Sequence, residues 1–150
     1  MIFGKTGVWG LNYIFQLGSE SQQHFLKHHF YPSEEGPDGD LWIGFSDQDT
    51  DGVFKWTDGS STSTGFENFG ENQPVNTVGT WDCGSIYTGN PDLKWETMSC
   101  FRDQGFICQI RSGRELDENT GSNYHGCKSG WQAFKDPKTG SVECLSLIHI

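Results

Sequence analysis

Cysteine thiols and acidic side chains are the groups in this chain whose types and spacing could do chemistry. The five cysteines are Cys83, Cys100, Cys108, Cys127 and Cys144, and no two of them form a Cys-x-x-Cys pair. That spacing argues against a zinc ribbon or a thioredoxin motif, and it favours disulfide bonds formed in an oxidising compartment. The acidic side chains gather in polar loops, where they suit a divalent cation that binds through oxygen atoms.

A series of short motifs lies between residues 41 and 108. In order, the motifs are Leu41-Trp42-Ile43-Gly44, Trp56-Thr57-Asp58-Gly59, Gln73-Pro74, Asp82-Cys83, the segment from Trp95 to Cys100, and Phe106-Ile107-Cys108. This series resembles a C-type lectin-like domain. The resemblance implies an α+β fold with a short antiparallel sheet, flanking helices and a long loop region. In that family, side chains of the long loop decide whether the domain holds calcium and a sugar.

The resemblance places the primary calcium and sugar site in the loop that begins at Gln73. The positions that correspond to ligands in sugar-binding members are Gln73, Val75, Trp81, Glu96 and Thr97. A valine side chain has no oxygen, an indole only donates, and a threonine hydroxyl is a weak substitute for a carboxylate. Because calcium takes six to eight oxygen ligands, we expect this site to be degenerate. The alternative is a competent lectin with rearranged ligands, in which Asn76 replaces the missing amide and Trp81 stacks on a sugar.

The resemblance also implies an auxiliary calcium site. Family members often hold this ion with two acids on the turn after the Trp-Ile-Gly strand and two acids or amides of the long loop. The matching residues here are Asp47, Asp51, Asn76 and Asp82. Three carboxylates and one amide, with main-chain carbonyls, would form a sufficient oxygen shell, so we expect calcium as a cofactor at this position only.

The cysteines fit the same resemblance in part. It implies one disulfide between Cys83 and Cys100, which would close the long loop, and one between Cys127 and Cys144, which would close a hairpin. Cys108 is then left unpaired, because its family partner lies in the first helix and no cysteine precedes Cys83. We therefore expect an incomplete or atypical N-terminal part, and the alternative is that Cys108 is a free buried thiol.

Local signals predict the elements that position these residues. Residues 19–22 form a capping box, apolar side chains follow at Phe25, Leu26 and Phe30, and Pro32 ends the predicted helix. Strands are predicted at residues 41–45, 53–56, 84–87, 94–96 and 105–110. The polar, glycine-rich excursion between Gly59 and Lys94 is long for a structureless loop, and such loops are usually functional.

The chain divides into three parts. Residues 1–112 are predicted to form the lectin-like domain, and residues 113–126 are a polar linker that carries Gly, Asn and Asp. Residues 127–150 resemble the N-terminal hairpin of a second, truncated domain of the same family. The natural protein is therefore predicted to be a tandem array similar to the mannose receptor group of endocytic receptors.

Composition excludes several classes of function. The formal net charge is −10, and Lys and Arg are not clustered, so a nucleic-acid partner is not expected. The chain has no long apolar run, so we expect no membrane contact by this segment, and its first residues do not form a signal peptide. No nucleophile elbow, phosphate loop or paired-carboxylate frame is present, so we do not expect an enzyme.

The sequence therefore predicts an extracellular, carbohydrate-recognition-type binding module whose own sugar site is degenerate. Its expected partner is a glycan or glycoprotein that the whole receptor array binds. Besides the competent lectin, a structural module without any ligand remains as an alternative.

Overall fold

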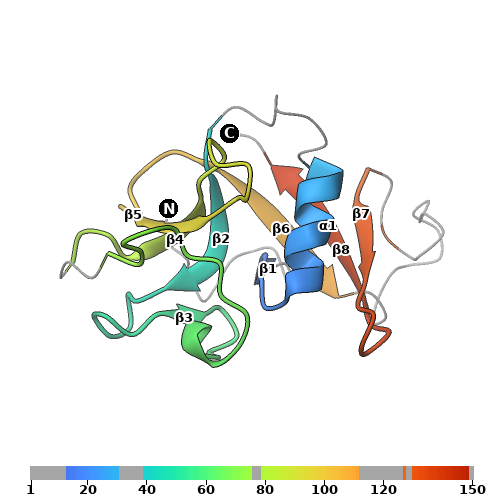
Figure 1. Ribbon diagram of the computed structural model, residues 1–150, viewed down its shortest axis with the longest axis horizontal. Helices are drawn as coiled ribbons and strands as arrows, with labels where there is room; N and C mark the ends of the chain where they lie inside the picture. Colours follow the sequence, from blue (N-terminus) through green and yellow to red (C-terminus); the bar gives the residue numbers. More distant parts are fainter. Residues whose placement is uncertain (1–12, 31–38, 76–78, 112–126, 128–129, 149–150) are drawn as a thin grey trace.

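The computed structural model describes residues 13–30, 39–75, 79–111, 127 and 130–148 (Figure 1). The described elements, in chain order, are β1 (Tyr13–Ile14), α1 (Glu20–Phe30), β2 (Leu41–Ser46), β3 (Lys55–Trp56), the 3₁₀ helix η1 (Thr62–Thr64), β4 (Cys83–Ile86), β5 (Trp95–Met98), β6 (Gly105–Arg111), β7 (Gln132–Lys135) and β8 (Val142–Ile148). None of the described helices has the length and apolar character needed to cross a membrane.

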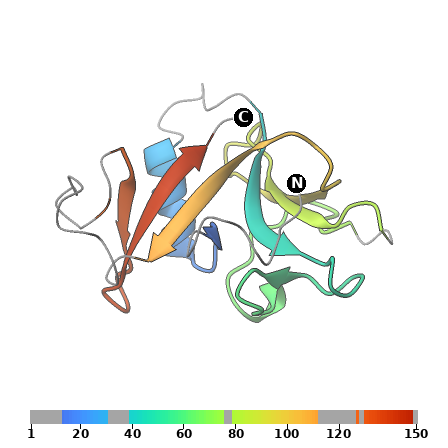
Figure 2. The same ribbon diagram turned by 180° about the vertical axis from the view of Figure 1, so that it is seen from behind.

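The strands form one sheet in the order β5-β4-β2-β6-β8-β7, with β1 paired to β6 and β3 paired to β2. Helix α1 lies over the β6–β8 half of this sheet (Figures 1 and 2). The α+β class is confirmed, but the sheet is mixed rather than antiparallel, because β2 and β6 run parallel. The long excursion between these two strands brings β6 back beside β2 in the same direction.

Helix α1 begins where the capping box predicts. The Ser19 hydroxyl accepts a hydrogen bond from the Gln22 amide at 3.1 Å, and the Gln22 side chain accepts one from the Gly18 amide at 2.9 Å. These bonds satisfy backbone donors that a helix start leaves without partners. Leu26 is fully buried, and the ring of Phe25 contacts the ring of Phe134 at a centroid distance of 5.3 Å.

Strand β2 is buried along almost its whole length, and Gly44 explains how it packs so closely. A Cβ atom at Gly44 would lie 2.6 Å from the backbone oxygen of Ile14. The Gly44 amide donates to the Phe15 carbonyl at 2.9 Å, so the N-terminal segment crosses directly over β2. Any side chain at this position would force the two backbones apart.

Large aromatic rings form the centre of the core. Trp95 is fully buried and lies between the rings of Phe45, Trp56, Phe66 and Phe69, at centroid distances from 5.3 to 6.0 Å. Phe66 and Phe69 belong to the long loop, so this one strand residue holds the loop against the sheet. Edge-to-face ring pairs add stabilisation beyond the buried area.

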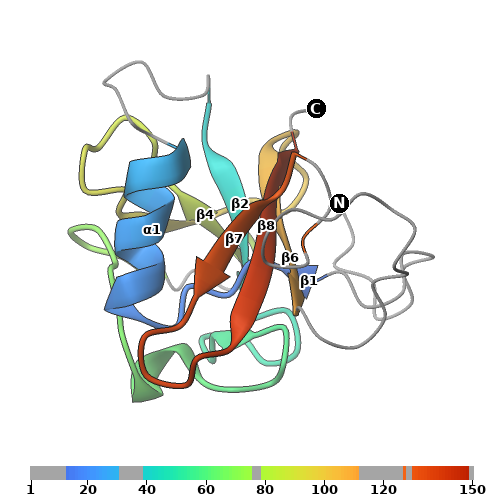
Figure 3. The ribbon, with the colours of Figure 1, turned by 90° about the vertical axis from the view of Figure 1, so that its right-hand side faces the viewer.

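The C-terminal hairpin lies in the same sheet as the rest of the chain. Strand β8 pairs with β6 over six consecutive residue pairs, from Phe106↔Ile148 to Arg111↔Glu143. Phe134 and Leu145 of the hairpin belong to the same core cluster as Leu26 and Trp95. Figure 3 shows β7 and β8 beside α1. That residues 127–150 begin a second domain stays a prediction, and the linker at residues 113–126 lies outside the described residues.

Candidate functional site in the long loop

Gln73, the first of the expected sugar-site ligands, is occupied by hydrogen bonds within the protein. Its side-chain oxygen accepts from the Thr97 amide at 3.0 Å, from the Thr97 hydroxyl at 3.1 Å and from the Val75 amide at 3.3 Å. The Val75 amide also lies 3.0 Å from the Thr97 hydroxyl oxygen. Thr97 is 1% exposed. This network ties the loop to β5, and it uses the oxygen that a calcium ion would need.

Glu96 lies elsewhere. Neighbouring residues of a strand point to opposite faces, so Glu96 is turned away from Thr97 and Gln73. Its carboxyl group lies beside the carboxyl group of Asp40. Burial and the nearby Asp40 carboxyl raise the pKa of Glu96, and the charge of Arg102 offsets part of that increase. The Glu96 carboxyl group thus lies beside Asp40, whereas the Gln73 side chain contacts Thr97.

The remaining positions of the loop supply no replacement carboxylate. Val75 is partly buried beside Thr97, and Trp81 is 37% exposed on the loop surface. Asn76 lies outside the described residues. The side chains at two predicted ligand positions, Gln73 and Thr97, thus hydrogen-bond to each other.

The auxiliary calcium position differs from the sugar position, because the carboxyl groups of Asp47, Asp51 and Asp82 lie near one another there. Asp47 is 4% exposed, and one of its carboxylate oxygens, Oδ2, accepts a hydrogen bond from the Gly52 amide at 2.8 Å. The Asp47 amide donates to the Asp82 carbonyl at 3.1 Å, which holds the turn against the start of β4. Asp51 lies on the same turn and is exposed.

Two buried oxygens at this position have no partner among the described residues: Oδ1 of Asp47 and Oδ1 of Asp82. Leaving a charged acceptor buried and unpaired is costly, and a cation between the two carboxylates would remove that cost. The described residues do not contain three His, Cys, Asp or Glu side chains already arranged to hold a metal ion. What the turn does present is two buried carboxylate oxygens without a partner, on Asp47 and Asp82, and the exposed carboxylate of Asp51.

The pKa of Asp82 also indicates that these carboxyl groups are close together. Burial, together with the negative charges of Asp47 and Asp51, raises the pKa of Asp82 above its ordinary value of 3.8. A raised folded-state pKa means that the protonated form is favoured by folding. The resulting stability is fully present below pH 3.8 and is lost as the pH rises through the raised pKa.

A pH series without metal checks this electrostatic conflict. In chelator, we expect the urea midpoint of the wild-type chain to fall as the pH rises through the folded-state pKa of Asp82. Asp82→Asn cannot ionise, so its midpoint is expected to fall less over the same range. If both proteins show the same pH dependence, the Asp82 carboxylate is not destabilised by its neighbours.

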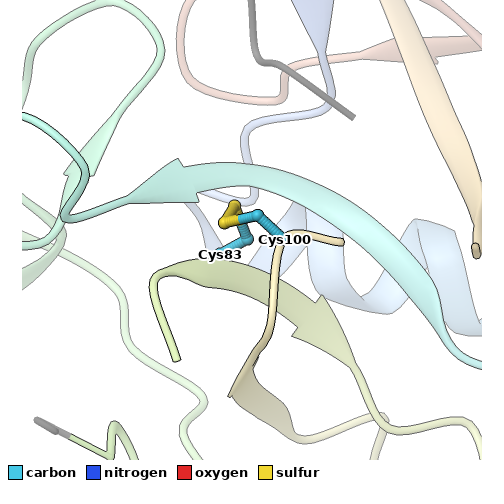
Figure 4. The surroundings of a disulfide bond; sticks show 2 residues. All are labelled: Cys83 and Cys100. Atoms are coloured by element: carbon cyan, nitrogen blue, oxygen red, sulfur yellow. A yellow bond between two sulfur atoms is a disulfide. The ribbon is translucent and has the colours of Figure 1, made fainter. Parts of the chain in front are cut away.

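The structure contains two disulfide bonds, Cys83–Cys100 and Cys127–Cys144, each with a sequence separation of 17. Figure 4 shows the first, which joins the start of β4 to the segment that follows β5. Its sulfurs pack in a small cluster with Trp42 and Met98. Cys108 is free and partly buried, and burial raises the pKa of its thiol. A thiol with a raised pKa is a poor nucleophile at neutral pH.

Comparison with models of known protein families shows to which family this chain belongs. The family model described as the lectin C-type domain matches residues 13–110, which is more than half of the chain. The chain belongs to the C-type lectin family. Members of this family are carbohydrate-binding proteins rather than enzymes, they typically bind calcium, and they are typically extracellular. The two disulfide bonds fit such a setting.

Several C-type lectins are similar to this chain in sequence. Echinoidin from Heliocidaris crassispina is 29% identical over 102 residues, which cover 67% of this chain and 67% of echinoidin. Asialoglycoprotein receptor 1 from Mus musculus is 33% identical over 98 residues, which cover 62% of this chain and 31% of the receptor. C-type mannose receptor 2 from Rattus norvegicus is 33% identical over 93 residues, which cover 61% of this chain but 6% of that receptor.

Solved C-type lectin structures share the fold. The EPNH mutant of CEL-I superposes with a TM-score of 0.54 at 22% identity, covering 65% of this chain and 66% of CEL-I. The carbohydrate-recognition domain of the human scavenger receptor C-type lectin gives a TM-score of 0.52 at 23% identity, covering 65% of this chain and 70% of that chain. These structural similarities show that the aligned part of this chain has the C-type lectin fold.

Proposed function

We propose that this C-type lectin chain is a recognition module whose primary sugar site is degenerate and whose calcium binds at the auxiliary position. The observation that carries the first half is the Gln73 side chain, because its oxygen already accepts from Thr97 and Val75. A calcium ion at Gln73 would have to break these hydrogen bonds. It would then lack the Glu96 carboxylate, which lies beside Asp40.

Retention on immobilised sugar tests the degenerate site. We expect equal retention of the chain on mannose-agarose, and on galactose-agarose, in calcium and in chelator. A calcium-dependent increase that Gln73→Ala or Glu96→Ala abolishes would contradict the proposal. That outcome would favour the second candidate, a competent lectin with rearranged ligands. The partly exposed ring of Trp81 favours this candidate, because it offers a face for sugar stacking.

The second half of the proposal concerns calcium. Asp47, Asp51 and Asp82, together with Asn76, are proposed to hold one ion that stiffens the long loop without creating a sugar site. The orphaned Oδ1 atoms of Asp47 and Asp82 support this assignment. Calcium supplies charge neutralisation there, and the side chains supply acceptor oxygens from one turn and from the residue before β4.

We further propose that the module works in a tandem receptor, similar to the mannose receptor group of endocytic receptors. The match to one part of C-type mannose receptor 2 supports this context. In such an array, sister domains would bind a glycan or glycoprotein, and this module would space them or contact protein. The receptor array and its extracellular, endocytic role remain proposals for the whole protein.

A further inference from the structure

Helix α1 presents two imidazole rings side by side to the solvent. His24 and His28 are four residues apart on this helix, and both are exposed. Residues with this spacing lie on the same face of a helix, one turn apart. The ring centroids of His24 and His28 are 4.7 Å apart, and the ring planes are nearly perpendicular, at 88°. The two imidazoles are therefore already adjacent in the folded chain.

The opposite side of α1 is fixed to the rest of the domain. Successive residues of a helix turn by about 100°, so Gln22 and Leu26 lie opposite the two histidines. Leu26 is fully buried, and Gln22 is 8% exposed. The side-chain nitrogen of Gln23 donates to the Asp92 carbonyl at 3.2 Å. An ion that binds both imidazoles therefore meets a helix that is already formed, and little backbone entropy is lost on binding.

Paired imidazoles are ligands for transition metals. Imidazole nitrogen suits Zn²⁺, Cu²⁺ and Ni²⁺, whereas Ca²⁺ and Mg²⁺ prefer oxygen ligands. Two histidines four residues apart on one helix face bind a single zinc ion in helical zinc motifs. Turning a nitrogen of each ring toward one ion requires only rotation of exposed side chains, which is fast. Once one imidazole has bound, the helix holds the second near the ion at a high effective concentration.

The charges around the pair are compatible with a cation. Glu20 lies one turn before His24 on the same face and is exposed. Lys27 precedes His28 in the sequence, and its Nζ atom forms an ion pair with Oδ1 of Asp92 at 3.6 Å. The formal net charge of the whole chain is −10. The carboxylate of Asp92 thus offsets the lysine charge that would otherwise repel a metal ion.

The protein supplies two ligands rather than a closed shell. Within the described part of the chain, no group of three or more His, Cys, Asp or Glu side chains is placed to hold a metal ion. The other coordination positions of an ion on His24 and His28 would be filled by water or by a ligand from solution. Open positions of this kind distinguish such a site from a structural zinc site, which takes all four ligands from the protein.

We propose that His24 and His28 bind one divalent transition-metal ion of the zinc and copper class. Cu²⁺ binds more tightly than Zn²⁺, following the general order for nitrogen ligands. The pair lies on α1, over the β6–β8 half of the sheet, whereas the expected calcium position lies at the turn after β2 (Figure 1). The two positions use different elements and different ligand atoms, nitrogen on α1 and oxygen at the turn.

Calorimetric titration of the full chain with zinc chloride tests the proposal. Excess calcium is present throughout, because calcium competes for oxygen ligands but not for imidazole. We expect saturable binding of one zinc ion, and tighter binding of copper(II). The Cys108→Ser chain should bind zinc with the same affinity, since the partly buried thiol is not part of the site. A folded wild-type chain that shows no saturable binding at millimolar zinc, or binding that Cys108→Ser abolishes, would overturn the proposal.

Single variants localise the ion. His24→Gln and His28→Gln each leave one imidazole, and each is expected to weaken zinc binding by about a hundredfold, a gain that linked binding groups commonly provide. Both positions are exposed, so the variants should remain folded. His29→Gln is the matched control, because it removes an exposed imidazole of the same helix whose ring stacks on Phe25 at a centroid distance of 4.1 Å. It should keep the wild-type affinity. Zinc affinity that either pair variant leaves unchanged, or that His29→Gln lowers equally, contradicts the proposal.

Discussion

Replacing Trp95 with Ala is expected to lower the free energy of unfolding by about 3–5 kcal/mol, the usual cost of removing a fully buried large ring. Trp95 is 0% exposed and contacts the rings of Phe45, Trp56, Phe66 and Phe69. A loss of this size is a large share of the roughly 5–15 kcal/mol that stabilises a typical domain. Urea unfolding followed by circular dichroism measures it.

The loop should respond as well, because Phe66 and Phe69 each lose a ring contact when Trp95 is removed. We expect faster proteolysis within residues 59–75 of the Trp95→Ala chain than of the wild type. Phe101→Ala is the control, since Phe101 is 93% exposed and its loss should change the unfolding free energy by less than about 0.5 kcal/mol. Equal stability of the Trp95→Ala chain and the control would show that the loop is not held by this ring.

Replacing Leu145 with Ala is expected to destabilise the whole domain by about 2–5 kcal/mol. Leu145 is 0% exposed, lies in the main core cluster and pairs with Gln109 of β6. Because the hairpin is part of the sheet, we expect the hairpin and the sheet to unfold in one cooperative transition. Leu145→Ala should shift this whole transition to lower denaturant concentration. Denaturant unfolding monitored by both fluorescence and circular dichroism measures this shift.

Lys138→Ala is the matched control, because Lys138 is exposed in the turn of the same hairpin. It should leave the unfolding midpoint unchanged. If Leu145→Ala also leaves the main transition unchanged, residues 127–150 behave as an independent unit, as expected for the beginning of a second domain.

Local signals in the sequence were sufficient for most elements. The capping box at Ser19 and Gln22 predicts the start of α1, and the strands predicted at residues 41–45, 84–87, 94–96 and 105–110 correspond to β2, β4, β5 and β6. The second predicted strand, residues 53–56, is shorter in the structure, where β3 contains Lys55 and Trp56 only. Such short edge strands depend on one pairing with a neighbour, which the local sequence does not encode.

Nonlocal contacts could not be predicted in the same way. The pairing of β8 with β6 joins residues more than thirty positions apart, and the sequence of the hairpin is equally compatible with a sheet of its own. The hydrogen bonds between Gln73 and Thr97 depend on the path of the loop.

Stability measured with and without calcium tests the central claim most directly. At about a hundred times its dissociation constant, an ion that binds only the folded state adds roughly 2.7 kcal/mol of stability. We expect calorimetric melting of the wild-type chain at neutral pH to show this gain in calcium relative to chelator. Asp82→Asn should lose it, and Asp103→Asn, which changes an exposed carboxylate, should keep it. A wild-type melting temperature that millimolar calcium leaves unchanged would contradict the account, and Asp47, Asp51 and Asp82 would then form only an acidic turn.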